Sequence, residues 1–359
     1  MLTASPIHQI LDLARWAPSG DNTQPWRFEI LDDFRFVIHG FDTRAHCVYD
    51  LDGRASQMSL GALIETLCIA ASAFGLRAQV SRRMDTPDTH PTFDVTLQPD
   101  SLVTVSKLLA AIPLRSVQRR PFSPKRLSAE QKAALERSLD TGYRLLWLEG
   151  AVAKWRTALL MFANAKLRLT TEEAYRVHRD IIHWGRRYSP DRVPDQALGV
   201  DALTLKLMHW IMRDWNRVQF FNRFLAGTWA PRIQMDLLPS LMCGAHFVIL
   251  RENPPVSVDD YIDSGRMVQR LWLTSTLLGL KHQPELTPLI FGRYVNNAVM
   301  FSSSKSAIHL ARELAAQTDQ LVGSALSCAI WMGRIGSGPN PKARSTRRQL
   351  LELIRHRQD

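Results

Sequence analysis

Hydrophobic residues near the start of the chain follow a helical period. Apolar side chains recur over residues 7–14, and Ser5 and Pro6 before them suit an N-cap and a first helical position. Since the residue before a proline avoids the α region, Pro18 predicts that this helix ends shortly before it. Residues 19–24 are then expected to form an exposed polar turn.

Short runs with strand-like composition follow. RFEIL and FRFVIHG flank Asp32 and Asp33, which predicts a β-hairpin. Four later segments predict further strands: TFDVTL, YRLLWLE, HFVIL and AIWMGRI. With long apolar helices between them, these strands favour an α+β fold, in which a mixed or antiparallel sheet is flanked by helices.

Two long apolar segments share one template. GALIETLCIAASAFGLRAQ begins at Gly61 and GRMVQRLWLTSTLLGLKHQ begins at Gly265, and in both a second glycine follows fourteen residues after the first. Both segments predict buried helices that end at a glycine. A match at a fixed offset is typical of an internal duplication, although any buried helix with a glycine stop has a similar pattern.

Composition and charge narrow the class of protein. The 359 residues are 45% hydrophobic and 22% charged, which suits a globular chain with a substantial core. The formal net charge is +11, but the arginine clusters lack the interleaved aromatic residues of single-strand binders and show no helix-turn-helix or RRM pattern. We therefore expect solvated basic faces and no nucleic-acid partner.

The sequence gives little indication of a membrane-spanning helix, a secretion signal or a disulfide framework. The longest apolar stretches fall short of the roughly 20 residues that a spanning helix needs, and no secretion signal is recognisable. The four cysteines are far apart and form no CxxC pair, which argues against a zinc ribbon or a disulfide scaffold. These features predict a cytoplasmic protein without a membrane partner.

The stretch APSGDNTQPW, residues 17–26, combines a helix stop, a small polar loop and the entry to a strand. Such a loop is suited to holding an anion-bearing ligand. An ordinary helix-to-strand loop over a buried Trp26 would have the same composition, so the local pattern leaves both interpretations open.

At these residues the chain resembles the nitroreductase-like flavoproteins, whose sequences commonly carry APS, a short gap and then NxQPW before a strand. In that family the segment lies against the flavin. The resemblance implies cofactor contacts at Pro18, Ser19 and Asn22, and structural roles for Gln24 and Trp26. It also implies a nitroreductase-like α+β fold with FMN as the cofactor.

The repeat is similar to a particular branch of that family. Nitroreductases are typically two-fold dimers with each flavin at the interface, and the Acg-type branch resembles such a dimer fused into one chain with one cofactor site degraded. This resemblance implies two pseudo-symmetric halves, a degenerate first half over 1–111 and a second half over 112–359. Residues 151–232 would be a helical insertion acting as a lid. Since the interface is then internal, we expect a monomer, with a dimer as the alternative.

AIPLRSVQRRPF, from Ala111, is similar to the Arg-rich stretch with which family members bind the flavin phosphate. Guanidinium groups supply the charge-assisted, bidentate donors that suit a phosphate. Arg115 and Arg119 are therefore predicted phosphate ligands, with Ser116 as a hydroxyl donor. The residues at 116–118 depart from the family pattern.

Two more segments complete the expected site. The run MGRIGSGPNPKARSTRR is similar to the family's closing strand and basic tail, which implies that Arg344 and Arg347 return to the same phosphate. GLKHQPELTPL stands in place of the family's turn whose backbone N–H faces flavin N5, so Gln283 and Pro284 are predicted cofactor contacts. The Glu and the final Gly of that turn are replaced here.

The middle of the chain, residues 154–229, is rich in Trp, Arg and His. The Glu and His residues within 172–183 do not share a helical face, so no metal site is expected. Six large aromatic residues are interpreted as core side chains, with a lid or substrate wall as the alternative: Trp210, Trp215, Phe220, Phe221, Phe224 and Trp229.

No GxSxG, Walker, kinase or GxGxxG motif is present, and no catalytic side chain is assigned. In flavin enzymes the cofactor carries the hydride or electrons, and the protein supplies positioning and electrostatics. The resemblance therefore implies an FMN-dependent oxidoreductase that works through flavin N5. NAD(P)H would be the electron source, and a small, apolar or aromatic molecule the acceptor. The alternative is a protein that binds or sequesters flavin without NAD(P)H turnover.

Overall fold

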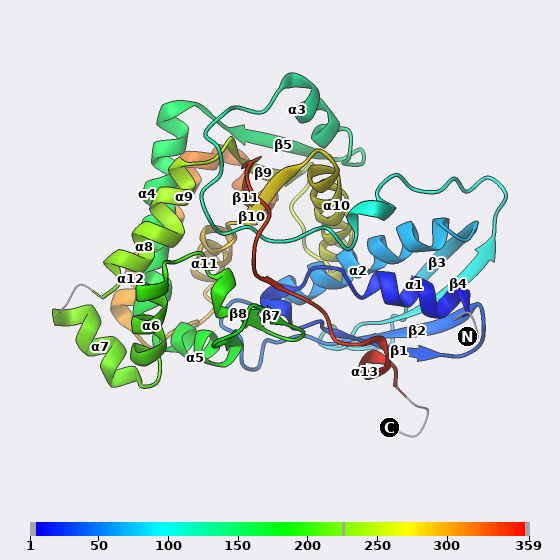
Figure 1. Ribbon diagram of the computed structural model, residues 1–359, viewed down its shortest axis with the longest axis horizontal. Helices are drawn as coiled ribbons and strands as arrows, with labels where there is room; N and C mark the ends of the chain where they lie inside the picture. Colours follow the sequence, from blue (N-terminus) through cyan, green and yellow to red (C-terminus); the bar gives the residue numbers. More distant parts are fainter. Residues whose placement is uncertain (1–4, 225–226, 356–359) are drawn as a thin grey trace.

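The computed structural model describes residues 5–224 and 227–355. These residues form two four-stranded antiparallel sheets with helices packed against them, as Figure 1 shows. The α+β class predicted from the sequence is confirmed. In the described part of the chain, no helix is long and apolar enough to cross a membrane.

Residues 6–99 build the first sheet and two helices. In chain order the elements are α1 (Pro6–Ala14), β1 (Trp26–Ile30), β2 (Arg35–Gly40), α2 (Arg54–Ser72), β3 (Leu76–Arg82) and β4 (Thr92–Pro99). The strand order is β1-β2-β4-β3, and every pair is antiparallel. Ile10, Phe28 and Leu63 belong to the core that both helices share with this sheet. The predicted β1–β2 hairpin is confirmed.

Residues 143–337 contain a second sheet of the same topology. Its strands and its long helix are β5 (Tyr143–Leu148), β9 (Ala245–Arg251), α10 (Val258–Leu277), β10 (Leu280–Pro284) and β11 (Ala329–Ser337). The order β10-β11-β9-β5 repeats that of the first sheet read from β3 to β1, again with antiparallel pairs. Each half thus runs two strands, one long helix and two strands.

Additional segments are inserted mainly into the second half. Between β5 and β9 lie α4 (Gly150–Thr170), α5 (Glu172–Ile181), β6 (Ile182–His183), β7 (Tyr188–Ser189), β8 (Val193–Pro194), η3 (Asp195–Ala197), α6 (Ala202–Ile211), α7 (Trp215–Phe224), α8 (Trp229–Arg232), η4 (Ile233–Leu237) and α9 (Leu238–Leu241). Between β10 and β11 lie α11 (Thr287–Asn296), α12 (Lys305–Val322) and η5 (Gly323–Cys328). Most of these helices gather on one side of the second sheet, at the left of Figure 1.

The remaining short elements connect the parts described above. They are η1 (Gly20–Asn22), η2 (Leu109–Ala111), α3 (Ala129–Glu136), β12 (Arg344–Ser345) and α13 (Leu350–Leu353). After β11 the chain returns across the first half, as the red segment of Figure 1 shows. There, the Arg355 backbone N–H donates to Phe28 O at 2.7 Å. This return path brings the basic C-terminal segment back to the loop after α1.

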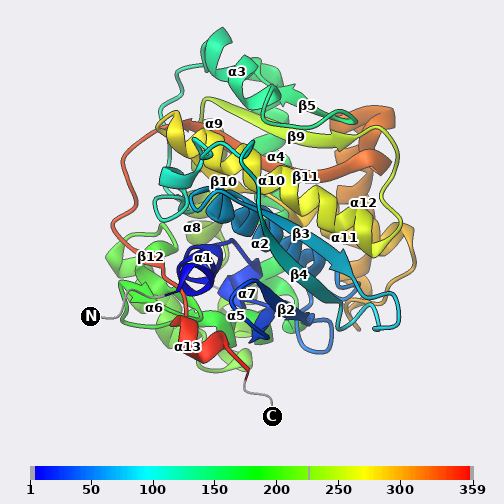
Figure 2. The same cartoon turned by 90° about the vertical axis from the view of Figure 1, so that its right-hand side faces the viewer.

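Helices α2 and α10 lie side by side between the two sheets, as Figure 2 shows, and cross at the two glycines that begin the repeat. A Cβ on Gly61 would lie 1.9 Å from the carbonyl oxygen of Ile262, and a Cβ on Gly265 would lie 2.0 Å from that of Met58. Ile262 precedes its glycine by three residues, as Met58 does. The two contacts are therefore equivalent by a pseudo-two-fold relation.

Two polar pairs beside the crossing follow the same relation. Gln269 Nε2 donates to Thr66 Oγ1 at 2.8 Å, and Arg270 Nε donates to Glu65 Oε1 at 2.5 Å. Counted from the two glycines, Glu65 is equivalent to Gln269, and Thr66 to Arg270. One equivalent contact is thus a hydrogen bond and the other an ion pair, so the two halves have diverged at their shared interface.

The first helix begins and ends close to its predicted limits, but its cap differs. Ser5 occupies the N-cap position, and its Oγ lies 2.7 Å from His8 Nδ1 instead of bonding a backbone N–H. The helix ends at Ala14, and a further turn of the chain precedes Pro18.

The helix crossing predicts a strong effect of adding one methyl group. Gly265→Ala should lower the free energy of unfolding by about 1–3 kcal/mol or more, because its Cβ meets backbone that cannot move aside. Urea denaturation measures this. Gly292→Ala in α11 is the control, because its Cβ would meet only ordinary contacts at 3.8 Å and should stabilise the helix by up to about 1 kcal/mol. Equal effects of the two changes would contradict the proposed close crossing.

Candidate functional site

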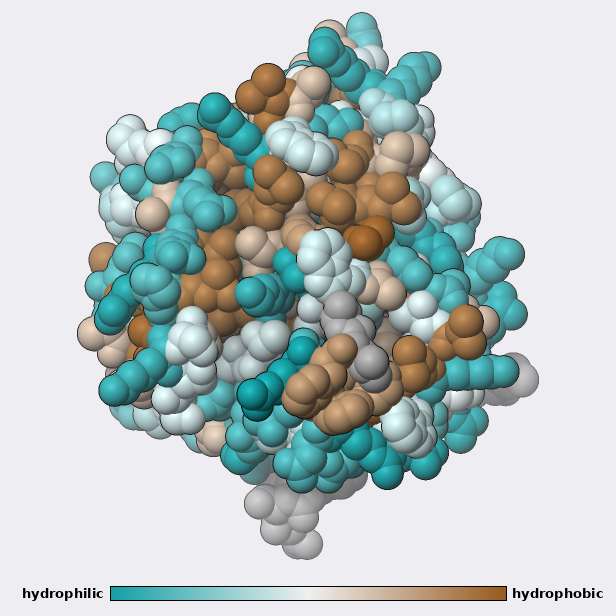
Figure 3. Space-filling view, turned by 90° about the vertical axis from the view of Figure 1, so that its left-hand side faces the viewer, coloured by the Kyte–Doolittle hydropathy of each residue, from teal (hydrophilic) through white to brown (hydrophobic). Residues whose placement is uncertain are grey.

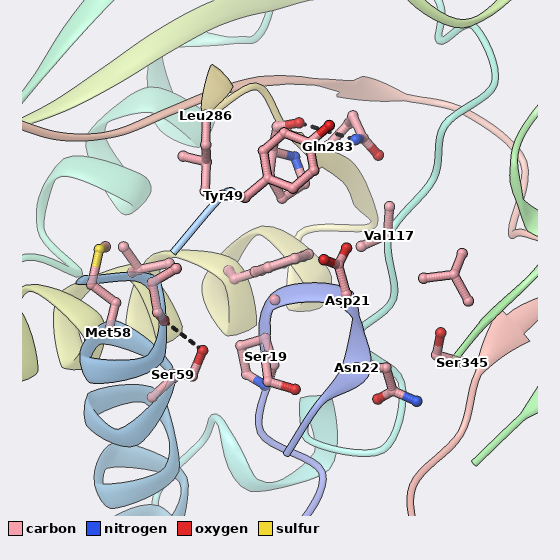
Figure 4. Close-up of a pocket in the computed structure, with 18 of the residues that line it drawn as sticks. Ser19, Asp21, Asn22, Tyr49, Met58, Ser59, Val117, Gln283, Leu286 and Ser345 are labelled. Carbon is pink, nitrogen blue, oxygen red and sulfur yellow. Dashed lines mark hydrogen bonds between the residues drawn. The ribbon is translucent and has the colours of Figure 1, made fainter. Parts of the chain in front are cut away.

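A cavity of about 320 Å³ lies where α2, α10, the loop after α1 and the returning C-terminal segment meet (Figure 4). Its size lies in the range of small-molecule sites. All ten residues predicted as cofactor contacts line it: Pro18, Ser19, Asn22, Arg115, Ser116, Arg119, Gln283, Pro284, Arg344 and Arg347. Motifs that are far apart in the sequence therefore converge on one cavity.

Other lining residues were not predicted from the sequence. Polar or ionisable examples are Asp21, Tyr49, Ser59, Arg168, His178 and Ser345. Asp21 lies inside the APSGDNTQPW stretch and could have been included on that ground. The others come from α2, from the segment before it, from the insertion and from β12, and no motif marks them.

The loop after α1 is only partly exposed, which corrects the expected exposed turn: Asn22 and Gln24 are buried, whereas Gly20 remains exposed. Asp21, Asn22 and Gln24 have positive φ angles of 51°, 66° and 52°, in the left-handed region that Asp and Asn tolerate better than most residues. Gln24 Nε2 donates to Pro190 O at 2.8 Å, and Gln24 Oε1 accepts from the Arg348 N–H at 3.0 Å. The inserted segment and the C-terminal segment therefore cover the loop, and Gln24 has the structural role that was expected.

Four guanidinium groups gather around Trp16, and the three that line the cavity form the cluster described here: Arg115, Arg344 and Arg347. Arg115 Nη2 and Arg347 Nη2 both donate to Trp16 O, at 3.1 and 3.4 Å, and the Arg344 guanidinium lies over the Trp16 ring at 5.2 Å. Arg347 Nε also donates to Ala17 O at 3.0 Å. Residues predicted from separate motifs, at 115 and at 344–347, thus form one cationic cluster.

This cluster has no acidic partner in the described part of the chain. None of its three arginines forms an ion pair with Asp or Glu there. Burial, together with the charges of Arg347 and Arg344, lowers the pKa of Arg115, and burial with Arg344 and Arg15 lowers the pKa of Arg347 to about 9. Backbone carbonyls hold these positive charges together, and an anion in the cavity would relieve their repulsion.

Arg119 has different neighbours from the cluster. Burial lowers its pKa to about 10, opposed by the charge of Asp21, and Arg168 and Arg334 are its other charged neighbours. Its Nη1 donates to Ala197 O at 3.2 Å. Arg119 lines the cavity, but its charged neighbours are Asp21, Arg168 and Arg334 and not the arginines of the cluster, so its role as a phosphate ligand stays a prediction.

Asp21 is an acidic residue within this cationic cavity. Figure 4 shows its carboxyl group pointing into the cavity, and its only hydrogen-bond partner among the described residues is the thiol of Cys47, 3.9 Å away. Burial raises its pKa to about 6, although Arg119 favours the charged form. Asp21 therefore holds a proton over part of the pH range in which most carboxyl groups are ionised.

Several buried polar atoms of lining residues have no hydrogen-bond partner among the residues that the structure describes. They are Asn22 Oδ1, Arg115 Nε, Gln283 Oε1, Thr287 Oγ1 and Arg344 Nε. Buried polar groups are normally hydrogen-bonded, because an unpaired one costs about 1–3 kcal/mol. The arginine Nε atoms are donors that suit an anionic group, and the two amide oxygens are acceptors that suit N–H groups. Together they indicate a ligand that carries both an anionic group and hydrogen-bond donors.

The rest of the wall is largely apolar. α2 supplies Met58 and Ala62, and α10 supplies Val268 and Trp272 from the other side of the helix crossing. The Arg115 guanidinium lies over the Trp272 ring at 4.6 Å. Since the wall needs both helices, the cavity depends on the close contact between the two halves.

The turn after β10 is fixed by a buried ionic network. His246 Nδ1 lies 2.6 Å from Glu285 Oε2, and Arg334 Nη2 donates to Arg119 O at 2.7 Å. Burial alone would lower the pKa of His246, but the Glu285 carboxylate raises it to about 10, so the pair is charged. Arg334 Nε also lies 3.8 Å from Glu285 Oε1, so this network ties the end of β10, where Gln283 and Pro284 lie in place of the expected turn, to the Arg-rich segment.

A tyrosine and a histidine from separate elements meet at the cavity. Tyr49 Oη lies 2.9 Å from His178 Nε2, and their rings are stacked with centroids 5.7 Å apart. Burial and the charge of Arg168 lower the pKa of His178 to about 3, so the imidazole is neutral. Within the described residues, no group of three or more His, Cys, Asp or Glu could hold a metal ion.

Part of the aromatic middle segment is on the surface, which corrects its interpretation as core. Exposed members are Trp210, Phe220, Phe224 and Trp229. None of them lines the cavity, so the alternative of a substrate wall does not apply to them either. Helical periodicity shows which residues share a face, but it does not show whether another element covers that face.

No protein-family model matches the chain. The chain is 28% identical over 187 residues to "Putative NAD(P)H nitroreductase Rv3131" of Mycobacterium tuberculosis, a match that covers 52% of each chain. It is 31% identical over 125 residues to "Putative NAD(P)H nitroreductase acg" of the same organism, covering 34% of this chain and 38% of that one. The matched region thus spans about half, or less, of these curated relatives.

Among solved structures, the FMN-dependent nitroreductase NfnB from Mycobacterium smegmatis in complex with NADPH is a distant neighbour. The alignment covers 68% of this chain and 96% of that one, at 14% identity and a TM-score of 0.35. The matches to the curated relatives support assignment of the chain to the nitroreductase-like superfamily, as its motifs predict.

The raised pKa of Asp21 predicts a pH-dependent stability. An acid whose pKa rises from 3.8 to about 6 on folding stabilises the folded chain below pH 3.8, and this contribution is lost as the pH rises through 6. Asp21→Asn, which cannot ionise and tolerates the same backbone conformation, should therefore unfold at higher urea concentration than the wild type at pH 7.5. The gain should shrink toward pH 4.5. Asp33→Asn, at an exposed turn, is the control, and a gain independent of pH would refute the assignment.

Proposed function

We propose that the chain binds one FMN in this cavity and acts as an FMN-dependent oxidoreductase. NAD(P)H is the electron source, and a small apolar or aromatic molecule is the acceptor. The observation that carries the proposal is the cluster of Arg115, Arg344 and Arg347, which lines the cavity and has no acidic partner in the described chain; Arg115 and Arg347 are buried and Arg344 is partly buried. The names of the curated relatives point to the same activity.

The three arginines bind the FMN phosphate in this proposal. A phosphate dianion needs strong donors and compensating positive charge, and guanidinium groups supply both. Backbone carbonyls already hold Arg344 and Arg347 in place, so little side-chain freedom is lost on binding. The unpaired Nε atoms of Arg115 and Arg344 are further donors.

The apolar wall and the turn after β10 receive the flavin ring. Trp272, Met58 and Val268 offer a surface for a flat aromatic ring, and Gln283 Oε1 and Asn22 Oδ1 are free acceptors for ring N–H groups. The Glu285 N–H is already bonded to Met332 O, so a backbone donor to the ring would come from the start of α11. When bound, FMN supplies the hydride chemistry.

A residue of the protein would donate the proton that reduction of the acceptor requires. Two-electron reduction of an acceptor by hydride also consumes one proton. The Asp21 carboxyl group points into the cavity and keeps its proton up to about pH 6, so it is positioned to donate one. The neutral His178 and Tyr49 form a second polar pair at the wall.

The two halves would form one site and not two. Ala55 and Leu286 line the cavity, and the residues at the same distance from the other glycine of the repeat are Asp259 and Arg82. Those two form a bidentate ion pair, with N–O distances of 2.7 and 3.0 Å. Side chains therefore pair with each other at the equivalent place, which supports the proposed fused arrangement with a degenerate first half, one FMN and a monomeric chain.

One observation favours the alternative of a flavin-sequestering protein. The inserted segment is tied over the loop after α1, since Asn22 Nδ2 donates to Arg192 O at 3.3 Å and Ser345 Oγ to the same oxygen at 3.0 Å. Val193 and Ala197 of that segment line the cavity. A lid held in this way would restrict the access of a nicotinamide.

Anaerobic reduction separates the two functions. The FMN-loaded protein is mixed with NADPH or NADH without oxygen, and the visible flavin absorbance is followed. The proposal predicts that a nicotinamide bleaches this absorbance and that adding oxygen or a quinone restores it. Bleaching by dithionite alone would favour sequestration. Failure to retain FMN at all would overturn both functions.

Replacing Arg115 tests the phosphate assignment. Arg115→Ala should weaken FMN binding by a free energy of about 2–5 kcal/mol and riboflavin binding much less, because only FMN presents a phosphate. Fluorescence titration of the apoprotein measures both affinities. Arg144→Ala, at an exposed position on β5, is the matched control and should change neither. Equal losses for FMN and riboflavin would show that Arg115 has only a structural role.

A further inference from the structure

Helices α6 and α7 form a pair that is apolar yet exposed. Seven of the ten residues of α6 are apolar, and none of the ten is buried; Val218 is the buried residue of α7. A helix that is apolar on all sides is normally covered by other elements or by a membrane. The described chain provides no such cover for the outer side of this pair.

The inner side of the pair is already used to hold it to the body of the protein. The His209 ring stacks on Trp184 at 4.6 Å, and the Trp215 ring lies 5.1 Å from that of Tyr175. Asn222 Nδ2 also donates to Leu169 O at 3.0 Å. The opposite side is therefore free to contact something else.

We call this opposite side the aromatic face, and it consists of Leu203, Leu207, Trp210, Phe220 and Phe224. The three residues on α6 follow the i, i+4, i+7 spacing of one helical stripe. Leu203 is 77% exposed and Phe224 is 63% exposed. Figure 3 shows hydrophobic side chains gathered on this side of the molecule.

The aromatic rings of the face form a continuous surface through Phe221. Ring centroids lie 5.7 Å apart for Trp210 and Phe221, 6.0 Å for Phe221 and Phe220, and 5.2 Å for Phe220 and Phe224. This contact chain joins α6 to α7. The face is thus a single patch and not a set of isolated apolar residues, which would need no explanation.

Basic residues are interleaved with the aromatic ones. Residues 202–224 contain four Lys or Arg and one acidic residue, Asp214. The Arg217 guanidinium lies over the Trp210 ring at 4.8 Å, and that of Arg223 over the Phe224 ring at 5.4 Å. Aromatic and leucine side chains bordered by Lys and Arg are the composition of helices that lie in the interface of an anionic membrane.

We propose that the aromatic face docks the protein on the surface of a membrane that contains anionic lipid. The helix pair would lie in the interface, with its apolar side chains among the acyl chains and its arginines at the headgroups. A second copy of the chain is disfavoured as the occupant, because a two-fold contact at this face would bring the same arginines together. This inference revises the expected absence of a membrane partner, which rested on the lack of a spanning segment. It does not depend on the proposed function.

Vesicle sedimentation tests the proposal. The full-length protein is mixed with vesicles of phosphatidylcholine alone or with 30% phosphatidylglycerol, and the pelleted fraction is measured. Wild type should pellet with the anionic vesicles, and more weakly at high salt. The triple variant Trp210→Ser, Phe220→Ser, Phe224→Ser should bind at least about tenfold more weakly. Arg217→Glu with Arg223→Glu should also weaken binding, by about fivefold or more per arginine.

A matched triple variant controls for the general loss of exposed apolar surface. Met84→Ser, Leu102→Ser and Leu351→Ser change residues that are exposed elsewhere, and this variant should bind as the wild type does. Thermal unfolding checks that each variant is folded. If the aromatic variant does not fold, the Arg217→Glu, Arg223→Glu variant still tests the proposal. Absence of wild-type binding, or equal binding by both triple variants, would overturn the proposal. The proposal would also be overturned if light scattering showed that the wild type is a dimer and the aromatic variant a monomer, while neither protein binds vesicles.

Discussion

The close crossing of α2 and α10 is the constraint on which the rest of the structure depends. Gly61 and Gly265 let the two backbones approach so closely that either Cβ would meet a carbonyl oxygen at 2 Å or less. This contact sets the two sheets in a pseudo-two-fold relation. It also brings the α2 and α10 walls of the cavity together. A chain that could not form this crossing would have two sheets but no shared site between them.

The site at this junction is cationic, because three arginines without a carboxylate partner in the described chain line it. Arg115, Arg344 and Arg347 come from the segment between the sheets and from the returning C-terminal segment, and backbone carbonyls orient them without any carboxylate in the described chain. Burial lowers the pKa values of all three arginines, and the charges of neighbouring arginines lower those of Arg115 and Arg347 further. The apoprotein therefore holds unfavourable charge that a bound phosphate would offset, which links cofactor binding to stability.

The sequence predicted the elements that local rules control and missed those that tertiary contacts control. The β1–β2 hairpin and α1 follow from turn residues, proline and periodicity. β3 and β10 begin directly after the glycines that end the two repeated helices. They were not predicted, because their polar residues interrupt the apolar pattern of a strand. The ten residues that converge on the cavity could be predicted as a set because family motifs carry them. Tyr49 and His178 carry no motif, and only the fold brings them together. The exposure of Trp210 likewise depends on which elements lie nearby.

We propose that the two halves form one FMN site per chain. Isothermal titration calorimetry of the FMN-free protein with FMN measures the number of FMN bound per chain most directly. Amino-acid analysis gives the protein concentration that this number requires. We expect one FMN per chain and an affinity that falls with rising salt concentration, because arginine charges would bind the phosphate. A stoichiometry of two would show that the place occupied by the Arg82–Asp259 pair is also a site. No binding heat, together with an unchanged flavin spectrum, would show that the cavity does not bind FMN.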